Sequence, residues 1–132
     1  METSLTVSPG SWTNLRLGSK DYNKRGEPPL IDCISIGHPS LTFKEDYDNC
    51  VVPMQVLAPE FDTAYSLELK QHTFQTFLSR QVPFEYRHFP GVEHSCFTRG
   101  DPSKPNEQDA MVRGKNAAVA WMREWLHPPF VA

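Results

Sequence analysis

Three short apolar stretches follow residue 29, and each predicts a strand. Residues 30–37 (LIDCISIG) are rich in β-branched side chains and lie between prolines, a pattern typical of a buried strand. Residues 51–57 (VVPMQVL) are mostly apolar in the same way and predict a second strand. Residues 82–89 alternate apolar and charged side chains, which predicts a third strand, and Pro83 near its start favours a position at or near a sheet edge.

Two longer segments repeat apolar residues near the helical period. Residues 67–80 predict one helix, with Thr73 and Gln75 facing outward and an apolar stripe made of Ala64, Leu67, Phe74, Phe77 and Leu78. Residues 107–126 predict a second helix, whose stripe comprises Met111, Ala118, Trp121, Met122, Trp125 and Leu126.

The order strand, strand, helix, strand, helix predicts an α/β fold of about three mostly parallel strands and two main helices. Residues 1–29 are rich in Ser, Gly, Asn and Pro and are expected to form an irregular leader. The folded domain is expected to span residues 30–132. Within it, the polar and acidic residues 42–49 predict a loop, and residues 91–106 predict another.

Composition excludes several function classes. The 132 residues suffice for one domain, and 39% hydrophobic with 22% charged residues indicate a folded chain. A net charge of −3 gives no basic surface for nucleic acid, so no nucleic-acid partner is expected. No stretch approaches the roughly 20 apolar residues that span a bilayer, and the polar N-terminus lacks the features of a signal peptide. We therefore expect a cytoplasmic protein with no membrane partner.

Cysteines and histidines give no sign of a metal centre. The three cysteines cannot all pair, and reduced thiols are the simplest interpretation. The five histidines are scattered without the tight Cys or carboxylate spacing of metal ligands, so neither a metal nor a cofactor is expected.

The candidate catalytic residues lie where the second and third predicted strands end. Asp62 follows the second strand, and His94 lies in the segment FPGVEH (residues 89–94) that closes the third. An acid and then a histidine, each at a strand end, form the second half of the order nucleophile, acid, histidine. The alternative for Asp62 is a helix N-cap or loop carboxylate, and for His94 an exposed loop histidine.

Several short motifs resemble the C-terminal half of the dienelactone hydrolase family, a branch of the α/β-hydrolases. The resemblance runs from about residue 30 to residue 126. It rests on a closing helix with alanines and tryptophans and on the pieces IGHPS (36–40), VPM (52–54), EFD (60–62), FPGVEH (89–94) and RGD (99–101). It implies an incomplete α/β-hydrolase fold and hydrolysis of ester or lactone bonds in a small-molecule substrate.

In that family a Cys-Asp-His triad performs the reaction, and the resemblance carries the acid onto Asp62 and the base onto His94. Asp62 would hold one tautomer of His94, which would pass protons to and from the nucleophile. His38 and Ser40, in the matching segment after the first of these strands, are further candidates for residues near the substrate, and Ser40 is also considered as a nucleophile. A strand-end histidine is more often structural, however, and a hydroxyl after proline more often serves a turn.

The nucleophile is where this chain departs from the family. The motif Gly-x-Cys-x-Gly-Gly that holds the cysteine occurs nowhere in the sequence. Matching residues 11–13 to those that usually follow that motif puts the cysteine position near Val7, so the chain is expected to retain only the acid and the histidine and to be inactive alone. The native thiols Cys33, Cys50 and Cys96 are not expected to replace it, because Cys33 lies within an apolar strand and the others lack a suitably placed base.

A second interpretation is a truncated, non-catalytic binding or interaction module. In that case the strand at residues 30–37 would lack a neighbour, and its unpaired backbone groups would favour self-association through the exposed sheet edge. A flavodoxin-like binding domain also fits the order of elements, but no Gly-rich loop opens a helix here.

Overall fold

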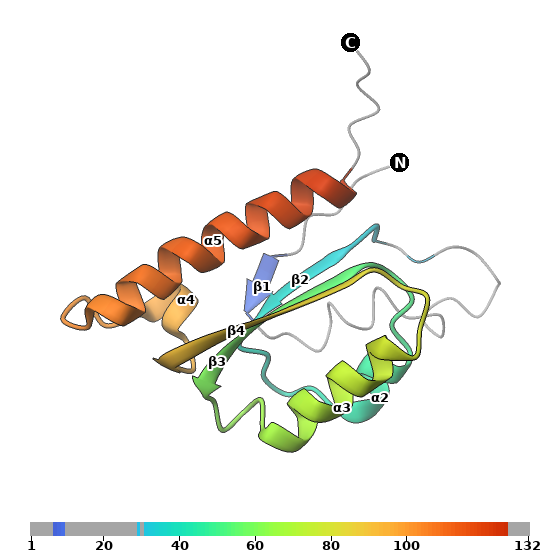
Figure 1. Ribbon diagram of the computed structural model, residues 1–132, viewed down its shortest axis with the longest axis horizontal. Helices are drawn as coiled ribbons and strands as arrows, with labels where there is room; N and C mark the ends of the chain where they lie inside the picture. The colour runs from blue at the N-terminus through green and yellow to red at the C-terminus, as the bar shows by residue number, and fades with distance from the viewer. Residues whose placement is uncertain (1–6, 10–28, 30, 127–132) are drawn as a thin grey trace, which may run out of the picture.

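A four-stranded parallel sheet forms the centre of the computed structural model, which describes residues 7–9, 29 and 31–126 (Figure 1). The strands lie in sequence order across the sheet, and every neighbouring pair is parallel. They are β1 (Val7–Pro9), β2 (Ile34–Gly37), β3 (Met54–Phe61) and β4 (Phe84–Glu93). The predicted α/β class is confirmed, and so is the position of the strand after Pro83 at an edge of the sheet.

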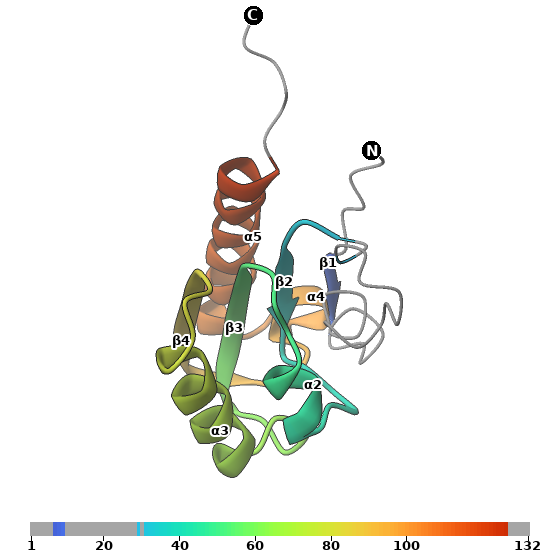
Figure 2. The same ribbon diagram turned by 90° about the vertical axis from the view of Figure 1, so that its right-hand side faces the viewer.

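Helices cover both faces of the sheet, as the two views in Figure 1 and Figure 2 show. One face is covered by α5, with the short α4 beside it, and the other by α2 and α3. The helices are α2 (Lys44–Asp48), α3 (Leu67–Leu78), α4 (Cys96–Arg99) and α5 (Pro105–Trp125). The two main helices that the sequence predicts are therefore α3 and α5.

The prediction of a loop at residues 42–49 is wrong, because α2 lies there. The backbone N–H of Phe43 donates to the Asp46 carboxylate at 2.8 Å, which caps the first turn of the helix. Tyr47 is fully buried and its hydroxyl lies 2.9 Å from Thr42 Oγ1. A single buried aromatic residue in five gives no periodic apolar signal, and this explains why the sequence pattern hides the helix.

A strand also lies inside the segment 1–29 that the sequence predicts to be irregular. Val7, Ser8 and Pro9 of β1 pair with Ser35, Ile36 and Gly37 of β2. The predicted free edge on β2 is therefore covered by three residues of β1. The rest of the predicted leader, apart from Pro29, lies outside the described residues.

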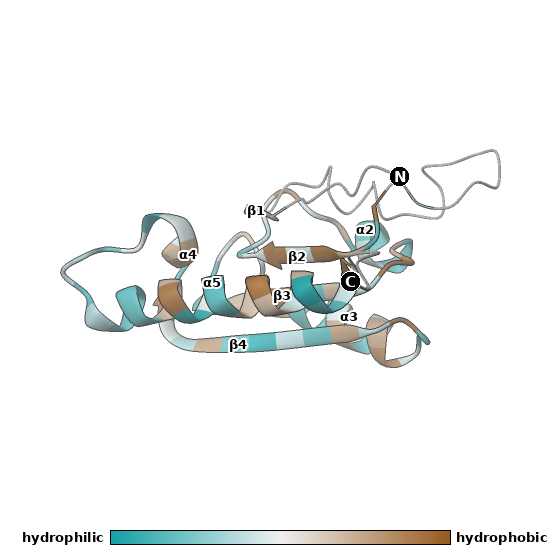
Figure 3. Ribbon diagram, turned by 90° about the horizontal axis from the view of Figure 1, so that it is seen from above, coloured by the Kyte–Doolittle hydropathy of each residue, from teal (hydrophilic) through white to brown (hydrophobic). Residues whose placement is uncertain are grey.

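Alternating side chains of β3 separate the two halves of the core. Met54, Val56 and Ala58 pack with residues of β2, α2 and α3, whereas Leu57 packs with Phe89 and residues of α5. Figure 3 shows how the strands differ in hydropathy: β2 is largely hydrophobic, whereas the middle of the edge strand β4 is hydrophilic.

The buried side of α3 differs from the predicted stripe. Leu69, Thr73 and Phe77, spaced four residues apart, are buried, whereas Leu67 and Leu78 are among the exposed hydrophobic side chains. Thr73 was predicted to face outward, but its hydroxyl donates to the Leu69 carbonyl at 2.8 Å. That hydrogen bond allows a polar residue to take a core position.

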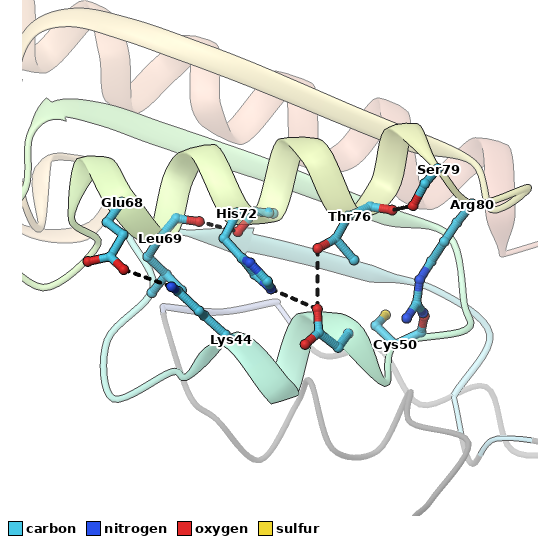
Figure 4. Close-up of polar contacts among 10 residues, drawn as sticks. Lys44, Cys50, Glu68, Leu69, His72, Thr76, Ser79 and Arg80 are labelled. Atoms are coloured by element: carbon cyan, nitrogen blue, oxygen red, sulfur yellow. Dashed lines mark hydrogen bonds and ion pairs between the residues drawn. The ribbon is translucent and has the colours of Figure 1, made fainter.

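Hydrogen bonds and ion pairs connect α2 and its flanking residues to α3 (Figure 4). Asp48 accepts from Thr76 at 3.3 Å and lies 2.7 Å from His72, while Lys44 pairs with Glu68 at 2.7 Å. These contacts hold the segment between β2 and β3 against α3, and this segment begins with His38 and Ser40, two residues of the candidate site.

Candidate active site

The candidate site lies at the carboxyl ends of β2, β3 and β4, the edge where parallel α/β sheets bind ligands. His38 and Ser40 follow β2, Asp62 follows β3 and His94 follows β4. The structure thus brings together all four residues that the sequence singles out.

An irregularity in β4 determines which residue faces Asp62. Pro59 pairs with Phe89, an offset of 30 residues, whereas Phe61 pairs with Glu93, an offset of 32. The backbone N–H of His94 then donates to the Phe61 carbonyl at 3.0 Å. Two residues of β4 are therefore accommodated in a bulge, and this places His94 rather than Val92 opposite Asp62.

The bulge has its own supports. Gly91 has φ +73°, in the left-handed region that glycine enters at little cost. Its N–H donates to the Glu60 carboxylate at 2.6 Å, and its carbonyl accepts from Asn106 Nδ2 at 2.6 Å. The Pro-Gly segment at residues 90–91 thus forms a fixed corner between β3, β4 and α5.

Asp62 is both a loop carboxylate that binds backbone N–H groups and the partner of His94. Its side chain is fully buried, and Oδ1 accepts the N–H groups of Ala64 and Tyr65, both at 2.9 Å, as a loop carboxylate does. The same oxygen lies 2.8 Å from Nδ1 of His94. Asp62 is not the N-cap of α3, because that position belongs to Ser66.

His94 is held from both ring nitrogens. Its Nδ1 faces Asp62, and its Nε2 lies 3.2 Å from Oγ of Ser40. A carboxylate at Nδ1 favours the tautomer with the proton on Nδ1, which leaves Nε2 free to accept the Ser40 hydroxyl proton. The side chain is 32% exposed, so it is not the freely exposed loop histidine of the alternative interpretation.

His38 forms the buried wall behind His94. Its ring centroid lies 4.9 Å from that of His94 in an edge arrangement and 5.5 Å from that of Phe97 in a stacked one. Burial lowers the pKa of His38, and the neighbouring His94 lowers it further. The imidazole is therefore favoured in its neutral form, which fits the structural role considered for this residue.

Two buried polar atoms at the site lack hydrogen-bond partners among the described residues, namely Nε2 of His38 and Oδ2 of Asp62. Phe97, which stacks on His38, is a site residue that sequence reasoning missed. Its aromatic ring also contacts Phe89, with centroids 4.7 Å apart. No local pattern in the sequence distinguishes Phe97 from an ordinary core phenylalanine.

The three thiols are buried and unpaired. Burial raises the pKa of Cys33 and of Cys50 to about 11, and that of Cys96 to about 12. Protonated thiols are poor nucleophiles at neutral pH, in agreement with the expectation that none of them replaces the missing cysteine.

Comparisons with known proteins show a weak sequence similarity to a hydrolase and a similarity in fold to a carboxylesterase. No protein-family profile matches this chain. Hydrolase pyvD from Aspergillus violaceofuscus is 24% identical over 110 residues, which are 83% of this chain and 44% of that protein. The carboxylesterase Cest-2923 from Lactobacillus plantarum superposes with a TM-score of 0.58 at 14% identity, over 86% of this chain and 53% of that one.

The fold is therefore that of a partial α/β-hydrolase, as predicted. The chain spans less than half the length of the curated relative that it matches. In the described part of the chain, no cluster of His, Cys, Asp and Glu side chains has the arrangement of a metal site, and no helix has the length and apolar character needed to cross a membrane.

Proposed function

We propose that this chain belongs to a hydrolase of the dienelactone hydrolase kind, acting on ester or lactone bonds with Asp62 and His94 as its acid and base. The observation that carries the proposal is the 2.8 Å contact between Asp62 Oδ1 and His94 Nδ1 at the carboxyl edge of the sheet. The relationship to pyvD, whose name is that of a hydrolase, supports the same reaction class.

In this proposal His94 Nε2 accepts the proton of a nucleophile and returns it to the leaving group. Asp62 fixes the tautomer and stabilises the imidazolium that forms. The carboxylate suits that task because it is buried and two backbone N–H groups fix its orientation.

The family's cysteine motif does not occur in this sequence. We therefore expect only slow hydrolysis, and only of activated esters with good leaving groups. The size of this chain relative to pyvD makes the substrates of the whole protein part of the proposal.

The test is hydrolysis of p-nitrophenyl acetate by the purified chain and by His94→Ala. His88→Ala is the matched control, because His88 is an exposed histidine on the same strand. The proposal expects His94→Ala to lose the protein-dependent rate and His88→Ala to retain it. Equal rates for all three proteins would contradict it.

A second candidate function is self-association through a sheet edge. β4 has ten residues and pairs only with β3 among the described strands, so one side of its backbone has no strand partner there. We propose that two copies pair along β4. Sedimentation velocity over a range of concentrations tests this, and a monomer at every concentration would contradict it.

A further inference from the structure

Ser40 completes a hydrogen-bonded series with His94 and Asp62. Its Oγ lies 3.2 Å from His94 Nε2, and His94 Nδ1 lies 2.8 Å from Asp62 Oδ1. Along the chain the three residues follow the order serine, acid, histidine, which is the order of α/β-hydrolase triads. We infer that Ser40 is the nucleophile of this chain, an inference that rests on the proposed ester hydrolysis and names the residue that attacks the substrate.

The backbone around Ser40 has the character that an exposed nucleophile requires. Ser40 follows the end of β2, between His38 with φ +36° and Leu41 with φ +57°. Two left-handed residues so close together make a sharp corner, and α2 begins at Lys44. A strand, a sharp turn and a helix are the elements that α/β-hydrolases use to present a nucleophile above the sheet.

Ser40 is also partly exposed, and the turn that carries it is held in place by His38. Its side chain is partly buried, and the preceding His38 is fixed by a backbone hydrogen bond from its N–H to the Leu57 carbonyl at 3.0 Å. The ring of His38 lies against both Phe97 and His94. His38 therefore fixes the turn that carries Ser40 and also packs against the ring of His94. This arrangement keeps the Ser40 hydroxyl within hydrogen-bonding distance of His94.

The proposed reaction has two steps, acylation of Ser40 and hydrolysis of the acyl-serine. Ser40 Oγ attacks the ester carbonyl carbon as its proton moves to His94 Nε2, and the resulting oxyanion expels the alcohol, which takes that proton from His94. Water then attacks the acyl-serine, giving a proton to His94, and collapse of the second oxyanion releases the acid and returns the proton to Ser40. In α/β-hydrolases the backbone N–H of the residue after the nucleophile donates to the oxyanion, and in this proposal that residue is Leu41.

Exposed apolar residues that neighbour the reacting residues in sequence support a substrate class. Leu41, next to Ser40, is 74% exposed, and Phe61, next to Asp62, is 57% exposed. Phe43 at the start of α2 is exposed as well. We therefore expect an ester with an apolar acyl group in preference to a charged one.

The first experiment is covalent labelling with a fluorophosphonate ester, followed by mass spectrometric mapping of the modified peptide. We expect label on Ser40 in the wild-type chain, none on that peptide in Ser40→Ala, and strongly slowed labelling in His94→Ala. Ser79→Ala is the matched control, because Ser79 is an exposed serine at the far end of α3 (Figure 4). Absence of label on Ser40, or label on a different serine, would overturn the inference.

A second variant keeps the inference testable if turnover is too slow to measure. In Ser40→Cys the introduced thiol faces His94, whereas the three native thiols are buried with raised pKa. We expect iodoacetamide to modify the introduced thiol at pH 7 at least tenfold faster than the native ones, and His94→Ala in that background to slow modification of the introduced thiol. Equal rates with and without His94 would overturn the inference. Circular dichroism and thermal unfolding of each variant confirm that it is folded.

The two proposals fail in different ways. If His94→Ala abolishes hydrolysis of p-nitrophenyl butyrate while Ser40→Ala leaves it intact, His94 activates water or another group, so Ser40 is not the nucleophile and the proposed function stands. If the wild-type chain hydrolyses no ester, the proposed function fails, while fluorophosphonate labelling still reports on Ser40.

Discussion

Asp62 binds His94 through Oδ1, the same carboxylate oxygen that accepts the two N–H groups of the following turn. One atom therefore shapes the backbone after β3 and orients the imidazole. Asp62→Asn separates these tasks, because an amide oxygen still accepts the N–H groups of Ala64 and Tyr65 but carries no charge. We expect the esterase rate to fall roughly 10²- to 10⁴-fold and the free energy of unfolding to change by about 1 kcal/mol or less.

The comparison variant for this prediction is Asp62→Ala, which removes the turn acceptor as well. Urea unfolding should show Asp62→Ala to be the less stable of the two, since the N–H groups of Ala64 and Tyr65 then lose their side-chain acceptor. Equal stability of the two variants would show that the turn does not depend on Asp62.

Gly114 on α5 lies against the ring that supports His38. A Cβ atom added there would lie 2.6 Å from Phe97 Cδ1 and 2.9 Å from Cε1. Helix propensity alone predicts that Gly114→Ala stabilises the protein by about 1 kcal/mol, but overpacking of this kind costs about 1–3 kcal/mol. We expect net destabilisation and, because Phe97 stacks on His38, a reduced esterase rate.

Thermal unfolding and ester hydrolysis of Gly114→Ala measure both effects. Lys115→Ala is its control, since Lys115 is the neighbouring exposed residue on the same helix. A Gly114→Ala protein that is more stable and equally active would show that Phe97 moves aside at no cost.

Stability should depend on pH through His38. Its folded-state pKa lies below the ordinary value of 6.5, chiefly because of burial, so the unfolded chain takes up the proton first as pH falls. The free energy of unfolding is then highest above about pH 6.5 and declines as pH falls from there through the folded-state pKa.

The measurement is urea unfolding at pH values between 7.5 and 5, for the wild-type chain and for His38→Asn. Asparagine tolerates the positive φ of this position and does not titrate. The variant should be less stable at pH 7.5 because the ring contacts with His94 and Phe97 are lost, but its stability should fall less on acidification. Parallel profiles would assign the pH dependence to other groups.

The three cysteines should be slow to react in the native protein. With pKa values of about 11 for Cys33 and Cys50 and about 12 for Cys96, few thiolates exist at pH 8, and burial restricts access to the reagent. Titration with Ellman's reagent should show all three thiols reacting promptly in urea and slowly without it. A thiol that reacts promptly in the native state would contradict the structure around it.

The three longer strands, the two main helices and the pairing of Asp62 with His94 follow from the sequence because they rest on local signals, whereas β1 and α2 do not. Apolar runs bounded by proline mark β2 and β3, the alternation at residues 82–89 marks β4, and the closing stripe marks α5. Residues at the ends of adjacent parallel strands meet at one edge, so an acid after β3 and a histidine after β4 are expected to lie close together.

The remaining features depend on interactions that no local pattern records. Thr73 is buried because its hydroxyl finds a carbonyl within its own helix, and Ser40 reaches His94 because two positive φ angles turn the chain after β2. Proline at position 39 indicates a turn but not its direction. The contact of Ser40 with His94 therefore becomes visible only in three dimensions.

The bulge in β4 has a consequence for reading related sequences. Because two residues of β4 have no counterpart in β3, strand length alone does not fix the spacing between the strand and its histidine. In a homologue without the bulge, the residue opposite the same carboxylate would lie two positions earlier, where Val92 stands in this chain. The catalytic histidine would be expected at that earlier position. Searches that require fixed spacing would pass over such proteins, whereas alignments that allow a two-residue gap at this corner would recover them.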